Sequence, residues 1–124
     1  MDYKKLLLTG VIIILIDVVF LYLVTPMFNQ MINNIQGEDI SVKSIPLMLV
    51  YIVVTFQIYY FILEKNAPLL DALILGMTTY GIFDLTNLTV FKNYSLPVTI
   101  LDICWGGILY VLVTFVFRYV ERKI

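Results

Sequence analysis

The chain of 124 residues has no histidine and a single cysteine, Cys104. Zinc-finger, His-based acid–base and haem-ligand functions therefore lack their usual side chains. One cysteine cannot form an internal disulfide, and no Gly-rich phosphate loop of the Walker or dinucleotide type is present. The motifs therefore predict no cofactor.

Charge is also scarce, because charged residues make up 14% of the chain and the formal net charge is −1. Proteins that bind nucleic acid usually present a clustered basic face, so we expect no nucleic-acid partner. Hydrophobic residues, by contrast, account for 61% of the sequence. A soluble domain of this size could not bury so much apolar surface. The composition therefore predicts an integral membrane protein whose neighbours are membrane lipids.

Four apolar segments are long enough to cross a bilayer as helices, which takes roughly 20 residues. We expect these spans at residues 6–25, 45–63, 68–91 and 96–119. Pro26 is expected to end the first span, whereas Pro46 lies in the first turn of the second, where proline is tolerated. The sequence thus predicts an all-α protein with one domain, a bundle of four transmembrane helices over residues 1–124.

Basic residues are divided unequally between the two predicted sides of the membrane. One side has Lys4, Lys5, Lys65, Arg118, Arg122 and Lys123, and the other has only Lys43 and Lys92. Since basic residues are enriched on the cytoplasmic side, we expect both termini there. Residues 27–44 form the one long connection. The short turns at 64–68 and 92–95 predict that the helices they join are antiparallel neighbours.

Three aspartates, Asp17, Asp84 and Asp102, lie deep within the predicted spans, where no Lys or Arg is placed to neutralise them. With a helical rise of about 1.5 Å per residue, all three fall roughly 17 to 22 Å from the inner side. An aspartate at the centre of a membrane helix costs about 2.5–3.5 kcal/mol, so these side chains should face inward. We expect a buried centre of three carboxylates that binds a proton or a hard metal ion.

Other polar and small residues fall near these aspartates. Five are expected to support the centre as neutral ligands or relay groups: Tyr51, Thr55, Tyr80, Thr86 and Asn87. Small residues allow membrane helices to approach closely. The residues expected in helix packing are Gly76, Trp105, Gly106 and Gly107. Tyr94 is expected to be a packing or interface anchor.

Three functions remain open at this point. The first is binding or conduction of a cation, for which four helices form a thin wall, so that a homo-oligomer is expected. The second is an integral-membrane enzyme that acts on a lipid or isoprenoid-like substrate, although the lack of histidine weakens it and no catalytic residue is assigned. The third is a structural or accessory subunit, in which the polar residues only hold helices together.

The sequence resembles the small four-helix membrane proteins grouped as domain of unknown function 2177 (DUF2177), which include bacterial, algal and giant-virus versions. The family pattern is an aromatic residue, an acid, any residue, Thr and Asn, then a basic turn, then Asp-x-x-Trp-Gly. The matching positions here are Phe83, Asp84, Thr86, Asn87, Lys92, Asp102, Trp105 and Gly106, with Asp17 in the first helix. Many members have tyrosine where this chain has Phe83. The resemblance implies the same fold and the same residues, but no activity.

Overall fold

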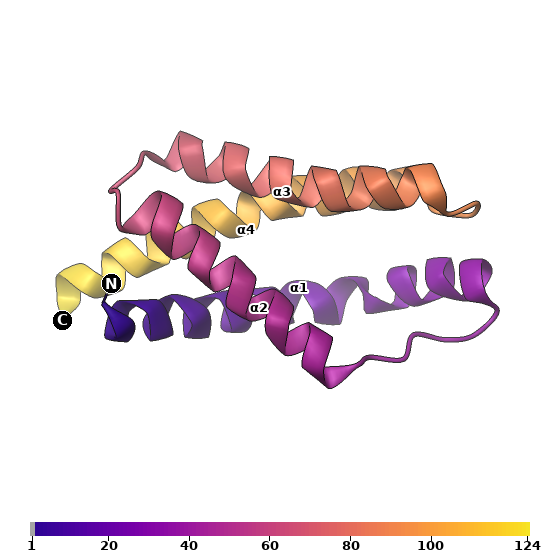
Figure 1. The fold of residues 1–124 in the computed structure, drawn as a ribbon, viewed down its shortest axis with the longest axis horizontal. Coiled ribbons are helices and arrows are strands. Elements are labelled where there is room, and N and C mark those ends of the chain that lie inside the picture. The colour runs from indigo at the N-terminus through magenta and orange to yellow at the C-terminus, as the bar shows by residue number, and fades with distance from the viewer. Residues whose placement is uncertain (1) are drawn as a thin grey trace.

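The computed structural model describes residues 2–124, which form four long helices (Figure 1). These are α1 (Tyr3–Gln36), α2 (Ser44–Ile58), α3 (Leu69–Val90) and α4 (Leu96–Lys123), and α2 continues into a π-helical turn, η1 (Tyr59–Leu63). Four helical stretches are long and apolar enough to cross a membrane: α1, α2 with η1, α3 and α4. The predicted all-α fold with four membrane-spanning helices is therefore confirmed.

The closest helix pair is α3 with α4, and glycine makes this close approach possible. A Cβ atom added at Gly76 would lie 2.2 Å from the backbone oxygen of Gly106. Gly107 faces Met77 and Leu73 in the same way, with an added Cβ 2.5 Å from Met77 Cγ. The three glycines therefore lie where α3 and α4 approach most closely, a place that small residues commonly occupy in membranes.

The second helix packs on α1, which it crosses obliquely, and diverges from α3 (Figure 1). Gly10 of α1 faces Thr55 of α2, whose Oγ1 would lie 3.4 Å from a Cβ added at Gly10. The expected neighbours α2 and α3 meet through a hydrogen bond of 2.7 Å from Gln57 to Thr79, but their backbones do not pack closely along their length. The glycine face of α3 is occupied by α4.

The first helix is longer than the sequence predicted, because it does not end at Pro26 but continues to Gln36. Its 34 residues extend roughly 51 Å, well beyond a hydrocarbon core of about 30 Å. The extension is held by a small cluster in which Met31 packs with Tyr94 and Val98. Gly37, with a φ of 78°, ends the helix in the left-handed conformation that favours glycine. The predicted long connection is therefore mostly helical.

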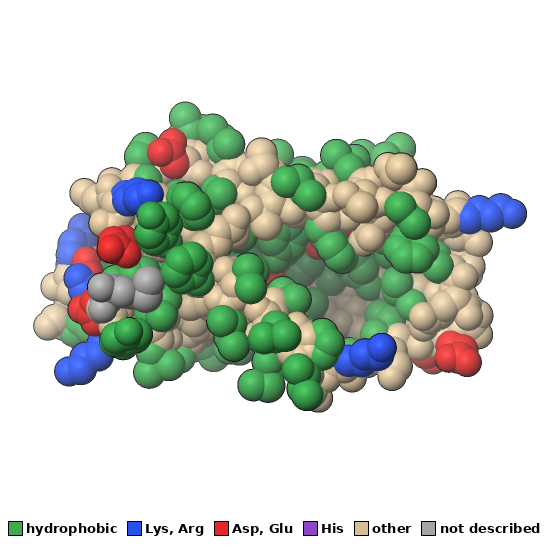
Figure 2. Space-filling view, in the orientation of Figure 1, with side chains coloured by type: hydrophobic (Ala, Val, Ile, Leu, Met, Phe, Trp, Pro, Cys, Tyr) green, Lys and Arg blue, Asp and Glu red, His purple; other side chains and the backbone are tan. Residues whose placement is uncertain are grey.

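The two ends of the chain lie at the same end of the bundle (Figure 1). There Lys5 Nζ forms an ion pair with Glu121 at 2.9 Å, which joins the first turns of α1 to the last turn of α4. Along the length of the bundle, large apolar side chains cover much of the surface (Figure 2). This distribution is what a lipid environment requires, since water would disfavour so large an apolar exterior.

Candidate functional site

All three aspartates predicted for the site are buried in the bundle. Their exposed fractions are 8% for Asp17 on α1, 0% for Asp84 on α3 and 7% for Asp102 on α4. The close packing of α3 and α4 brings the last two together, so that Asp84 is a neighbour of the Asp102 carboxyl. The structure therefore groups two of the three carboxyls as a pair.

Asp84 has one oxygen that is paired and one that is not. The hydroxyl of Tyr94 donates a hydrogen bond of 2.7 Å to Asp84 Oδ1. The other oxygen, Oδ2, is fully buried and accepts no hydrogen bond from the residues that the structure describes. Two ionised carboxylates can only accept hydrogen bonds, so a bond between Asp84 and Asp102 requires a proton on one of them.

Asp17 has its own set of donors. The Tyr51 hydroxyl donates to Asp17 Oδ2 at 2.6 Å, and Trp105 Nε1 donates to Oδ1 at 3.1 Å. The Trp105 ring stacks on Phe20, with ring centroids 4.3 Å apart. Both oxygens of Asp17 therefore accept hydrogen bonds, one from α2 and one from α4.

No metal site is formed by these acids. In the part of the chain that the structure covers, residues 2–124, no three Asp, Glu, His or Cys side chains lie close enough to hold a metal ion together. Calcium takes six to eight oxygen ligands and magnesium six, and usually more than one carboxylate is among them. Both oxygens of Asp17 instead accept hydrogen bonds, from Tyr51 and Trp105.

The predicted supporting residues are found in different places. Tyr51 contacts Asp17, and the Tyr80 ring lies against Gly106, where an added Cβ would be 2.4 Å from Tyr80 Cγ. Thr55 faces Gly10 on α1 rather than a carboxyl, and Thr86 is exposed on the outside of α3. Asn87 is half-buried, near the Tyr94 hydroxyl.

Two polar residues of the interior were not predicted as part of the site. Tyr94 lies in the turn before α4, outside any helical pattern, so no periodicity relates it to Asp84. Gln57 of α2 donates to Thr79 Oγ1 at 2.7 Å and accepts a hydrogen bond from Tyr110. A signal for Gln57 did exist, because an amide within an apolar membrane span usually has a polar partner.

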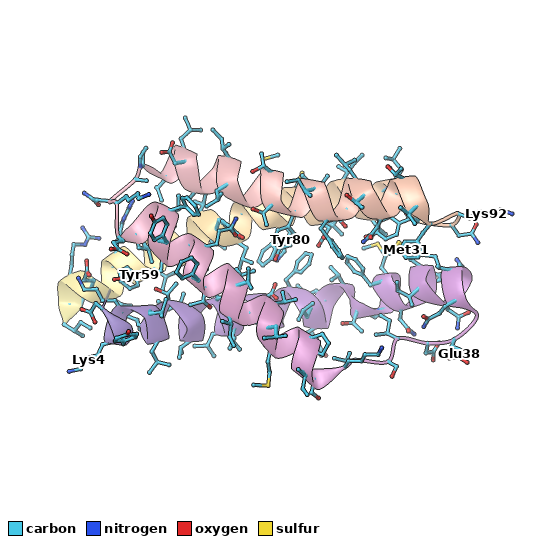
Figure 3. The ribbon with its side chains drawn as sticks, in the orientation of Figure 1. Lys4, Met31, Glu38, Tyr59, Tyr80 and Lys92 are labelled. Carbon is cyan, nitrogen blue, oxygen red and sulfur yellow. The ribbon has the colours of Figure 1, made fainter. Side chains whose placement is uncertain are left out.

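A cavity of about 490 Å³ lies where α2 diverges from α3. Figure 2 shows the hollow below α3, and Figure 3 shows Tyr80 directed into the space between the helices. The lining is mainly apolar, and one acid contributes to it: Leu49, Val50, Val53, Val54, Thr79, Tyr80, Phe83 and Asp102. One member of the carboxyl pair is therefore reached from an apolar cavity.

Comparison with known proteins agrees with this architecture. A family model described as "Predicted membrane protein (DUF2177)" matches residues 3–118, nearly the whole chain. No curated protein and no solved structure matches the chain. The match includes all three buried aspartates, the whole of the first three helices that could span a membrane and most of α4. The chain is therefore a multi-pass membrane protein that belongs to the DUF2177 family.

Proposed function

We propose that the protein binds an exchangeable proton inside the membrane, at the pair formed by Asp84 and Asp102, and conducts it across the bilayer. The observation that carries this proposal is the environment of Asp84 Oδ2. This oxygen is fully buried, accepts no hydrogen bond from the described residues, and belongs to a carboxyl that neighbours a second one. A proton held between the two carboxyls would satisfy that oxygen and remove one of two adjacent charges.

The geometry favours a proton over a hard metal ion. Two carboxyls can share one proton with no other ligand, whereas a hard metal ion needs several more oxygen atoms around it. Asp17, the remaining acid of the interior, already accepts hydrogen bonds from Tyr51 and Trp105. The pair alone would supply too few ligands for calcium or magnesium.

A route to one membrane surface is supported by Tyr94. Its hydroxyl donates to Asp84, and its backbone belongs to the turn between α3 and α4, at the end of the bundle away from the termini. A hydroxyl can accept one proton as it donates another, so Tyr94 can relay protons between this turn and Asp84. Gln57, Thr79 and Tyr110 form a second polar group, nearer the other end.

The test is proton flux in lipid vesicles that contain the purified protein and a pH dye, under an imposed membrane potential. We expect flux in the natural protein and at least a tenfold loss in Asp84→Asn and Asp102→Asn. The matched control is Asp71→Asn, which makes the same change at an exposed position of α3. The proposal would be overturned by equal flux in all variants, or by no flux in any of them.

Infrared spectroscopy of the same samples tests the proton itself. A protonated carboxyl has a C=O stretch that an ionised one lacks, so we expect this band in the natural protein and in Asp71→Asn. The band should be missing from the Asp84→Asn and Asp102→Asn variants. A natural protein without it at neutral pH would contradict a proton shared by the pair.

A second candidate, an enzyme that acts on a lipid, is favoured by the apolar cavity. Acid–base chemistry usually needs two groups within reach of the substrate, one to donate and one to accept a proton. Asp102 is the one carboxyl among the lining residues of the cavity, whereas Asp84 is fully buried and does not line it. We therefore rank this function below proton binding.

A further inference from the structure

The cavity between α2 and α3 combines three features. Half of its lining residues are aliphatic, two aromatic residues of α3, Tyr80 and Phe83, contribute to it, and Asp102 of α4 supplies a carboxyl. Asp102 is only 7% exposed. Unlike Asp17 and Asp84, it accepts no hydrogen bond from a Tyr, a Trp or a backbone N–H of residues 2–124. This acid therefore lines the cavity without a donor other than its partner acid.

The charge of the carboxyl pair follows from the proposed proton site, on which this inference rests. Two carboxyls with one proton carry a net charge of −1. All eight Lys and Arg residues belong to connecting segments or to the outer turns of helices, away from the middle of the bundle. A buried charge without a counter-ion is costly, so a positive charge from outside the chain would be strongly favoured beside Asp102.

We propose that this cavity binds a lipophilic organic monocation, such as an aryl- or alkyl-substituted ammonium or phosphonium ion. The positive centre lies against the Asp102 carboxyl and close to the Tyr80 and Phe83 rings, since aromatic faces attract cations. The apolar groups of the ion contact Leu49, Val50 and Val53 of α2. A volume of about 490 Å³ is within the range of about 300–1,000 Å³ usual for small-molecule sites.

Access to the cavity is from the lipid. Val53 and Phe83, on opposite walls, are 63% and 59% exposed, so the lining continues onto the apolar outer surface of the bundle. A lipophilic cation concentrates in the membrane and can reach Asp102 sideways, between α2 and α3. A small hydrated ion such as sodium has no such apolar surface and gains nothing from this lining.

Binding of tetraphenylphosphonium to the purified protein in detergent tests the proposal, and tetraphenylborate, an anion of the same shape, is the control ligand. We expect saturable binding of the cation and at least tenfold weaker binding of the anion. Asp102→Asn should weaken cation binding at least tenfold, Asp102→Glu should restore part of it, and Asp71→Asn should bind as the natural protein does. Equal binding of both ions, or unchanged cation binding by Asp102→Asn, would overturn the proposal.

A second variant tests the location of the bound cation without changing a carboxyl, so that the result does not depend on the folding of Asp102→Asn. Val53→Phe keeps both carboxyls and adds volume to a wall of the cavity, so it should weaken cation binding while the helical circular dichroism stays unchanged. Unchanged affinity in a folded Val53→Phe would contradict this location.

The two proposals can fail separately. If cation binding depends on Asp102 but the infrared band of a protonated carboxyl is absent, only the proposal of a shared proton is contradicted. If the band is present but the cation does not bind, only the proposal of a cation site is contradicted.

Discussion

Hydrogen bonds from aromatic side chains distinguish the three buried aspartates from one another. Asp17 accepts one bond from Tyr51 and one from Trp105, whereas Asp84 accepts one bond from Tyr94. Asp102 accepts no hydrogen bond from an aromatic side chain of residues 2–124, and its neighbouring acid is Asp84. Aspartates at similar depth therefore differ in how many hydrogen bonds their oxygens accept. A proton or a ligand would stabilise the pair of Asp84 and Asp102 most, because its oxygens accept the fewest.

Removal of the Tyr94 hydroxyl should destabilise the protein. Tyr94→Phe takes away the 2.7 Å hydrogen bond to Asp84 and leaves both oxygens of a fully buried carboxyl without an aromatic donor. The expected loss is about 1–3 kcal/mol, the usual cost of an unsatisfied buried polar group. Unfolding in mixed micelles with increasing detergent denaturant measures it.

The matched control for this change is Tyr22→Phe, because the Tyr22 side chain is 83% exposed and its loss of a hydroxyl should change stability very little. If the two variants unfold alike, the bond between Tyr94 and Asp84 contributes nothing to stability.

At the scale of helices, α3 and α4 form the most closely packed pair of the bundle. It places Asp84 and Asp102 side by side, and it depends on the contact between the Gly76 and Gly106 backbones. By contrast, α2 meets α3 less closely, and Gln57 of α2 donates a hydrogen bond of 2.7 Å to Thr79 of α3. The cavity therefore lies where the packing of the bundle is less close.

Substitution of the two glycines of α3 should have opposite effects. In Gly76→Ala the added Cβ would meet the backbone oxygen of Gly106 at 2.2 Å, so α3 and α4 must separate. We expect a loss of stability of about 1–3 kcal/mol, as for other overpacked sites, together with loss of proton flux. In Gly81→Ala the added Cβ meets no atom within 4 Å, and the higher helix propensity of alanine should make the change neutral or stabilising.

Thermal unfolding of both variants in the same detergent provides the measurement. An equal or smaller loss of stability in Gly76→Ala than in Gly81→Ala would show that close backbone contact does not hold α3 and α4 together.

At the scale of the whole molecule, the ends of the chain meet at one end of the bundle, where Lys5 pairs with Glu121. Four membrane spans predict this arrangement, since an even number of crossings returns the chain to its starting side. The excess of basic residues at that end predicts that it faces the cytoplasm.

Labelling of single cysteines tests this orientation. In a Cys104→Ser background, Glu64→Cys should react with a membrane-impermeant maleimide only after the cells are opened. Ser41→Cys, in the connection before α2, should react in intact cells, because it lies at the other end of the bundle. Reaction of both positions from the same side would contradict four crossings, and the reverse pattern would contradict cytoplasmic termini.

The sequence by itself determined the class of protein, the four spans and the burial of Asp17, Asp84 and Asp102. These properties depend on local composition, because the free energy of placing a segment in lipid is close to a sum over its residues. The positions of Gly76 and Gly106 also indicated where helices approach, since few other residues allow backbones to meet.

Only the tertiary structure decided which groups meet. Extension of α1 past Pro26 depends on the packing of Met31 with Tyr94 and Val98, which are distant in sequence. The divergence of α2 from α3, and with it the cavity at Asp102, depends on which helix occupies each small-residue face and not on the length of the turn between them. Pairing of two carboxyls, with the third satisfied by Tyr51 and Trp105, likewise follows from how helices face one another, and hydropathy along a single chain does not contain that information.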